Sequence, residues 1–137
     1  MKKTTGHPRR VLIVEDDPAL SRAVSITLGK HLGIEVVVAE NGRRAIEIAE
    51  SQWVDLVCLD LMLPEVSGFG VFEHLRRSPG LRDVPVVVMS GRGLPEDRAR
   101  ALELGAHVYF VKPFPLSALR AKVAALLARD DPSEASE

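Results

Sequence analysis

Five short apolar runs, each rich in β-branched residues, recur along the chain and are separated by longer segments with helical spacing. The runs are VLIV at 11–14, IEVVVA at 34–39, VDLVCL at 54–59, VPVVVM at 84–89 and VYFV at 108–111. Runs of this length and composition predict five β-strands. They are mostly continuously apolar, so both faces of the sheet must be covered. The strict alternation of strands and helices therefore predicts a parallel sheet between two layers of helices.

The segments between the predicted strands carry helix signals. In the last segment the apolar residues share one helical face: Leu116, Leu119, Val123, Leu126 and Leu127. Predicted helix starts are marked by residues that favour a cap or a first turn: Pro18, Asn41, Ser67 and Pro95. Gly33 and Gly105 fall where helices should end.

Strand order follows from the handedness of parallel connections and from composition. Crossovers are nearly always right-handed, and the runs at 11–14 and 54–59 suit the centre of the sheet. The run at 34–39 contains Glu35 and suits an edge. The predicted fold is a flavodoxin-like, doubly wound (βα)5 sandwich with a five-stranded parallel sheet of order 2-1-3-4-5.

Length and charge limit the class of protein. The 137 residues fit one domain, for which we predict a flexible N-terminal segment at 1–8, a folded domain at 9–129 and an acidic tail or linker start at 130–137. A formal net charge of −1 gives no field that would attract nucleic acid or anionic lipid. Only four apolar residues follow the basic start, too few for a signal peptide or membrane span. We expect a cytoplasmic protein without direct nucleic-acid or membrane binding.

Polar residues follow four of the five predicted strands, at the point where each strand ends. They are Glu15, Asp16, Asp17, Asp60, Ser90 and Lys112. In open α/β sheets the ligand crevice lies outside the carboxyl ends of the strands, so these residues should become neighbours. Crowded carboxylates repel one another, and a hard divalent cation with oxygen ligands relieves that repulsion. The chain therefore predicts a Mg²⁺ site.

The same residue types suit phosphoryl transfer. Asp60 can act as the nucleophile, and Lys112 and Ser90 can stabilise the oxygens of the moving group. The product would be an aspartyl phosphate. Each of these signals is weak by itself, since an acid after a strand is often only a helix-start residue. Their shared location at the carboxyl ends of the strands favours the functional interpretation.

Four stretches in this order, VLIVEDD, LDLMLPEVSG, VVVMSGRG and YFVKPF, resemble the receiver domain of bacterial two-component response regulators. The resemblance spans roughly residues 9–129. It implies a signalling phosphoacceptor that takes its phosphoryl group from a histidine kinase or phosphotransfer protein. It also implies that the domain is not an enzyme beyond catalysing its own phosphorylation and dephosphorylation.

The resemblance further implies a role for individual residues. The metal ligands would be Glu15, Asp16, Asp60 and the backbone carbonyl of Met62, with Asp60 also phosphorylated. Ser90 would be the switch hydroxyl, Tyr109 the aromatic that turns inward with it, and Lys112 the lysine of the site. Lys112-Pro113 would be a cis peptide bond, and Asp17 a helix-start residue.

Output is expected on the surface of the fourth helix, fifth strand and fifth helix, which would bind a protein target or a second copy. In one subfamily an Asp pair before the fifth strand helps build a symmetric dimer, but this chain has His107 and Val108 there. Arg92, two residues after Ser90, is a candidate shield of the acyl phosphate against water.

Three other functions share part of this residue pattern or topology. Haloacid-dehalogenase-like phosphatases need a second Asp two residues after the nucleophile, where this chain has Met62. A flavin carrier would need a phosphate-cradling loop after the first strand, where three acids stand instead. A docking-only receiver remains open, although every acidic, hydroxyl and lysine position is retained. Trp53, Phe69 and Phe72 are predicted to pack in the core.

Overall fold

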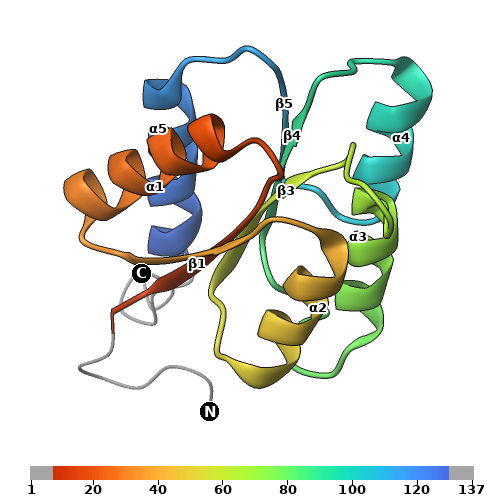
Figure 1. The fold of residues 1–137 in the computed structure, drawn as a ribbon, viewed down its shortest axis with the longest axis horizontal. Helices are drawn as coiled ribbons and strands as arrows, with labels where there is room; N and C mark the ends of the chain where they lie inside the picture. Colours follow the sequence, from red (N-terminus) through yellow and green to blue (C-terminus); the bar gives the residue numbers. More distant parts are fainter. Residues whose placement is uncertain (1–7, 130–137) are drawn as a thin grey trace.

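Five parallel strands form a single sheet at the centre of the molecule (Figure 1). This computed structural model describes residues 8–129, so the predicted acidic tail and all but the last residue of the predicted flexible segment lie outside the described residues. The strands are β1 (Arg10–Val14), β2 (Glu35–Ala39), β3 (Leu56–Asp60), β4 (Val86–Ser90) and β5 (Val108–Val111). Their order is β2-β1-β3-β4-β5, which confirms the predicted topology and the edge position of β2.

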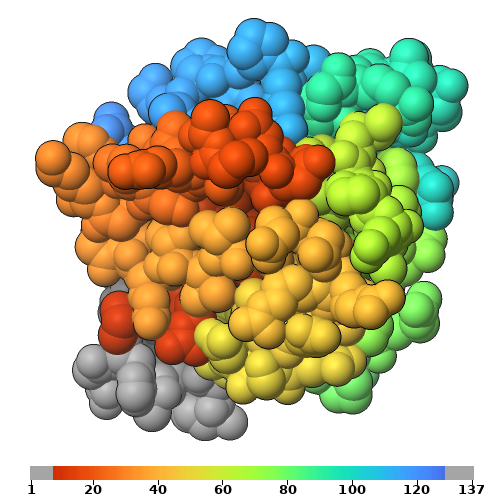
Figure 2. Space-filling view, viewed as in Figure 1, coloured from red at the N-terminus to blue at the C-terminus, as the bar shows by residue number. Residues whose placement is uncertain are grey.

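Helices cover both faces of the sheet. They are α1 (Pro18–Leu32), α2 (Gly42–Ser51), α3 (Gly68–Arg77), α4 (Pro95–Glu103) and α5 (Leu116–Arg129). Two apolar clusters result, one beneath α1 and α5 and the other beneath α2, α3 and α4. In the space-filling view, side chains fill the spaces between the ribbons (Figure 2).

Alternation within each strand explains why the runs are apolar throughout. Leu12 and Val14 of β1 join the cluster beneath α2 and α3, whereas Val11 and Ile13 join the cluster beneath α1 and α5. All four side chains are 0% exposed. A polar residue in either set would be desolvated, so both faces require hydrophobic side chains.

The predicted helix punctuation is confirmed. Asn41 accepts a hydrogen bond from the Arg44 amide at 2.8 Å, and Ser67 accepts one from the Gly70 amide at 3.1 Å. Pro18 and Pro95 open α1 and α4, Gly33 ends α1 in the left-handed conformation, and Gly105 follows α4. The Lys112-Pro113 peptide bond is cis, as the resemblance implied.

The aromatic predictions were right for two residues and wrong for the third. Phe69 and Phe72 are buried between α3 and the sheet. Trp53 is 41% exposed, because it lies in the connection before β3 and only part of the indole contacts the protein. No helix in residues 8–129 is long and apolar enough to cross a membrane. The cytoplasmic location remains a prediction.

Gly68 should tolerate no side chain. A Cβ there would overlap the carbonyl oxygen of Asp60 and the Cα of Leu61, because α3 starts against the end of β3. We expect Gly68→Ala to lower the free energy of unfolding by about 1–3 kcal/mol. Urea denaturation monitored by circular dichroism measures the change.

Gly29→Ala is the matched control for that measurement. Gly29 lies within α1, and its Cβ would make an ordinary 3.7 Å contact with the carbonyl oxygen of Ile34, just after the helix. Alanine has the higher helix propensity, so this variant should gain about 0.5–1 kcal/mol. Equal losses in the two variants would contradict the close approach at Gly68.

Candidate functional site

The carboxyl ends of β1 and β3 bring three acids together. Glu15 and Asp16 directly follow β1, Asp60 ends β3, and one carboxylate oxygen from each lies within 4.8 Å of the others. Glu15 and Asp60 are 1% and 2% exposed, whereas Asp16 is open to solvent. No other group of three or more His, Cys, Asp or Glu residues in the described part of the chain meets this spacing.

Lys112 supplies the compensating charge. It follows β5, and its Nζ lies 3.0 Å from Asp60 Oδ2 and 2.9 Å from Glu15 Oε1. Its backbone amide donates to the Ser90 carbonyl at 2.7 Å, which fixes the lysine beside the end of β4. One ammonium thus bridges the two buried carboxylates.

The bridge perturbs the ionisation of both partners. Burial raises the pKa of Glu15, the hydrogen bond from Lys112 opposes that rise, and the Asp60 charge adds to it, so the pKa lies above its usual value. Burial acts to lower the pKa of Lys112, but its hydrogen bonds to Glu15 and Asp60 and the attraction of their charges together outweigh burial and raise it. The lysine therefore stays charged at neutral pH.

The backbone holds Asp60 in place. The Met62 amide donates to Asp60 Oδ1 at 2.8 Å, and the Gly68 amide donates to the Leu61 carbonyl at 3.2 Å. These contacts bring the loop after β3 back over the site. Met62 thus lies beside the acids as predicted, with its side chain 48% exposed. Asp17 caps α1 by accepting from the Ala19 amide at 3.0 Å, the predicted helix-start role.

Ser90 lies one residue beyond Met89, the residue that pairs with Asp60 across β3 and β4. It is fully buried, and its Oγ accepts from the Arg92 amide at 3.1 Å. The Tyr109 hydroxyl donates to the Arg92 carbonyl at 2.7 Å, and the Arg98 guanidinium lies over the Tyr109 ring, 4.9 Å from its centroid. The two predicted switch residues are therefore linked through the Arg92 backbone.

Two contacts were missed by sequence reasoning. The Arg92 guanidinium, a candidate shield of Asp60, instead pairs with Asp97, with Nε 3.0 Å from Oδ2. The spacing of five residues around a helix start gave only a weak signal for this pair.

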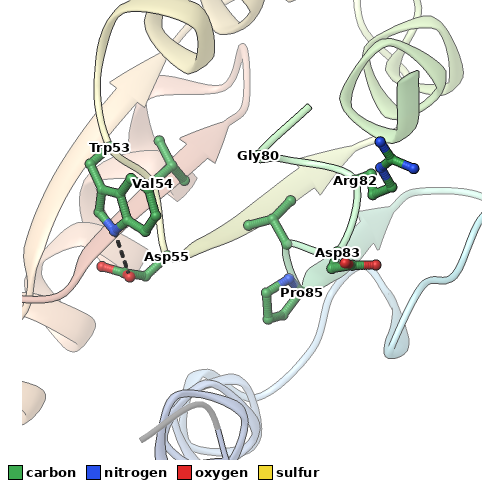
Figure 3. Close-up of a pocket in the computed structure, with 8 residues that line it drawn as sticks. Trp53, Val54, Asp55, Gly80, Arg82, Asp83 and Pro85 are labelled. Carbon is green, nitrogen blue, oxygen red and sulfur yellow. Dashed lines mark hydrogen bonds between the residues drawn. The ribbon is translucent and has the colours of Figure 1, made fainter. Parts of the chain in front are cut away.

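The second contact lies at the amino ends of the strands. There, buried Asp55 accepts a hydrogen bond from the Trp53 indole at 2.8 Å, beside a pocket of about 190 Å³ (Figure 3).

Cys58 lies in the middle of β3 and is 0% exposed. Burial raises the pKa of its thiol to about 12, so it remains protonated.

The sequence matches the response regulator receiver domain family over residues 11–124. The chain belongs to this family. The family consists of signalling receiver domains rather than conventional enzymes, and its members bind Mg²⁺ at an acidic pocket. The resemblance seen in the four sequence stretches is therefore confirmed for this receiver domain.

Relatives of this receiver domain include transcriptional regulators. The phosphate regulon transcriptional regulatory protein PhoB of Escherichia coli is 40% identical over 129 residues, which cover 94% of this chain and 56% of PhoB. The DNA-binding dual master transcriptional regulator RpaA of Synechocystis is 41% identical over 122 residues, covering 89% and 50%. The chain thus spans about half the length of these curated relatives.

Solved receiver domains share the fold. The receiver domain of the Francisella response regulator 1452 has a TM-score of 0.81 and 26% identity, covering 91% of this chain and 100% of that one. The receiver domain of a sensor histidine kinase from Pseudomonas aeruginosa, with a magnesium ion coordinated in its active site cleft, has a TM-score of 0.78 and 28% identity. It covers 88% of this chain and 98% of that one.

The raised pKa of Glu15 predicts a pH-dependent stability difference between wild type and Glu15→Gln. The folded state binds the Glu15 proton more tightly than the unfolded state, whose pKa is near 4.5. Wild type should therefore lose stability relative to Glu15→Gln as pH rises from about 4.5 through the folded-state pKa, with a constant difference above it. Urea unfolding of both proteins from pH 4 to 8 measures the difference, and a gap that moves the opposite way would contradict the prediction.

Proposed function

We propose that Asp60 accepts a phosphoryl group from the phosphohistidine of a histidine kinase or phosphotransfer protein. In this transfer the phosphorus–nitrogen bond of the donor breaks and a phosphorus–oxygen bond to Asp60 forms. The observation that carries the proposal is the convergence of Asp60 with two further acids and the Lys112 ammonium. A buried carboxylate held by an ammonium and a backbone amide is oriented for nucleophilic attack.

The acidic cluster fits Mg²⁺. Hard divalent cations prefer oxygen ligands and retain several waters, and the exposed Asp16 carboxylate leaves one side of the cluster open to solvent. We assign the ion to the acidic pair Glu15 and Asp16, with Asp16 a direct ligand, together with Asp60 and the Met62 backbone carbonyl. Bound there, it would neutralise charge on the transferred phosphoryl group.

Lys112 and Ser90 complete the proposed chemistry. Lys112 already contacts Asp60 and would pair with a phosphoryl oxygen, while the Ser90 hydroxyl would donate to another. The Ser90 hydroxyl accepts from the Arg92 amide and keeps its own proton for donation, but a shift of Ser90 toward the phosphoryl group would lengthen or break that hydrogen bond. Because the Arg92 carbonyl also holds Tyr109, that change would reach β5 and turn Tyr109 inward.

We further propose that the face formed by α4, β5 and α5 binds a protein target or a second copy. A hollow of about 210 Å³ on this face is lined by Arg98, Leu102 and Tyr109 among others, and Leu102 is 71% exposed. An apolar hollow beside a tyrosine that responds to Ser90 would change shape with phosphorylation. The domain would act as a cytoplasmic phosphoacceptor that catalyses only its own phosphorylation and dephosphorylation, without contacting nucleic acid or membrane itself.

Acetyl phosphate with Mg²⁺ should phosphorylate the wild-type protein once, and Asp60→Asn should abolish the modification. Intact mass spectrometry measures the added phosphoryl group. Asp83→Asn, an exposed acid just before β4 at the opposite end of the sheet, is the matched control and should be modified like wild type. Modification of Asp60→Asn to the wild-type level would overturn the assignment.

Asp16→Asn should separate metal binding from folding. Removing one of three crowded carboxylates relieves repulsion, so without metal the variant should melt about 1–3 °C above wild type. Adding Mg²⁺ should raise the melting temperature of wild type but not of the variant, which should also lose Mg²⁺-dependent phosphorylation. Differential scanning calorimetry with and without Mg²⁺ measures the melting shifts; a destabilised variant that still responds to Mg²⁺ would contradict the assignment.

A further inference from the structure

Arg92 joins the candidate site to α4 through three separate groups. Its amide donates to Ser90 Oγ at 3.1 Å, and its carbonyl accepts from the Tyr109 hydroxyl at 2.7 Å. Its guanidinium contacts Asp97 twice, Nε to Oδ2 at 3.0 Å and Nη2 to Oδ1 at 3.3 Å. A residue just beyond the phosphoacceptor site thus holds the first turn of α4 by a two-point ion pair.

Apart from the contacts of Arg98 with the Tyr109 ring and the Gly93 carbonyl, the first turn of α4 has few other side-chain restraints. Its N-cap is Leu94, which makes no side-chain hydrogen bond, and the buried residues of the helix are Asp97 and Ala101. Ala101 offers little apolar surface, so burial does little to hold the helix against the sheet. The ion pair with Arg92 is therefore a principal side-chain contact that positions this turn.

The other end of α4 is anchored independently. Arg76 of α3 donates to the Leu104 carbonyl at 2.6 Å and to the Val84 carbonyl at 2.9 Å, and Arg100 pairs with Glu73 at 2.9 Å. None of these contacts involves Arg92. If the Arg92 pair opens, the first turn can move while the last turn stays attached to α3.

Arg92 is the more accessible member of the ion pair. Its side chain is 51% exposed, whereas that of Asp97 is 12% exposed, so the arginine is the partner that faces solvent. Gly91 and Gly93 flank it, and a Cβ at Gly91 would meet nothing within 4 Å. Gly91 therefore leaves open space on one side of Arg92, whereas Gly93 packs closely against Val111, where an added Cβ would lie 3.0 Å from a side-chain carbon. Movement of the guanidinium would displace no core residue.

We propose that Asp97 and the phosphoryl group on Asp60 compete for Arg92, an inference that rests on the proposed phosphorylation of Asp60. A guanidinium prefers a phosphoryl group of about two negative charges to a single carboxylate. Transfer of Arg92 to the phosphoryl oxygens releases the first turn of α4. Asp97 is thereby a positioning residue that withholds Arg92 from the phosphate.

The competition would also set the lifetime of the phosphate. In hydrolysis a water oxygen attacks phosphorus, the phosphorus–oxygen bond to Asp60 breaks, and the acyl phosphate dianion plus water gives the Asp60 carboxylate and dihydrogen phosphate. A guanidinium over the phosphoryl oxygens obstructs the approach of water. Hydrolysis should therefore slow whenever Arg92 leaves Asp97.

The test measures phosphate loss in single and double variants. Proteins phosphorylated with acetyl phosphate and Mg²⁺ are desalted, and loss of the phosphoryl mass is followed over time. Asp97→Asn should slow the loss and Arg92→Gln should speed it, each by about two- to fivefold, the range available to a partly exposed ion pair. In the Arg92→Gln background, Asp97→Asn should have no further effect, because Asp97 acts only through Arg92.

Two further variants separate this role from a structural one. Glu73→Gln breaks another ion pair of α4 and should leave the rate of loss unchanged. Arg92→Lys keeps the charge without the planar fork and should give a rate between wild type and Arg92→Gln. Backbone hydrogen exchange at residues 93–98 should rise both in phosphorylated wild type and in unphosphorylated Asp97→Asn.

The outcomes distinguish failure of this inference from failure of the proposed function. If wild type takes up no phosphoryl group on Asp60, the proposed function fails and the competition falls with it. If wild type is phosphorylated but Asp97→Asn changes the rate equally with and without Arg92, or not at all, the competition alone is refuted.

Discussion

The contact between the Lys112 ammonium and two buried carboxylates is the interaction on which the candidate site depends. Glu15 and Asp60 are almost fully buried, and unpaired charges there would carry a large desolvation penalty. Lys112 contacts both of them from the end of β5, which is an edge strand of the sheet. The ammonium offsets the charge of both carboxylates where β1, β3 and β5 end, and this is where the proposed metal ligands and nucleophile lie together.

Much of the fold was predictable because its determinants are local. Continuous apolar runs, Pro at helix starts and Asn or Ser caps act within a few residues, and each was confirmed. Strand limits shifted where a local rule intervened: β4 begins at Val86, after Pro85, which lacks the amide proton that a strand uses. Trp53 was misplaced because hydrophobicity alone does not reveal that a connection leaves its side chain half covered.

The candidate site was predictable to the level of which residues meet, and no further. Parallel strands place their carboxyl ends along one edge, so the order of strands was enough to bring Glu15, Asp60 and Lys112 together. The direction of a long side chain depends on its three-dimensional neighbours. Arg92 therefore pairs with Asp97, and Arg76 with the carbonyls of Leu104 and Val84, in ways that no spacing rule indicated.

The distribution of apolar contacts explains why α4, rather than another helix, is suited to carry a signal. Helices α1 and α5 bury rows of large side chains such as Leu28 and Leu119, and moving them would open cavities in the core. Helix α4 buries only Ala101 as an apolar residue and is otherwise positioned by arginine contacts. Exchanging one ion pair for another costs far less free energy than repacking a core, so the proposed phosphorylation of Asp60 would need only a change of ion pairs to shift this helix.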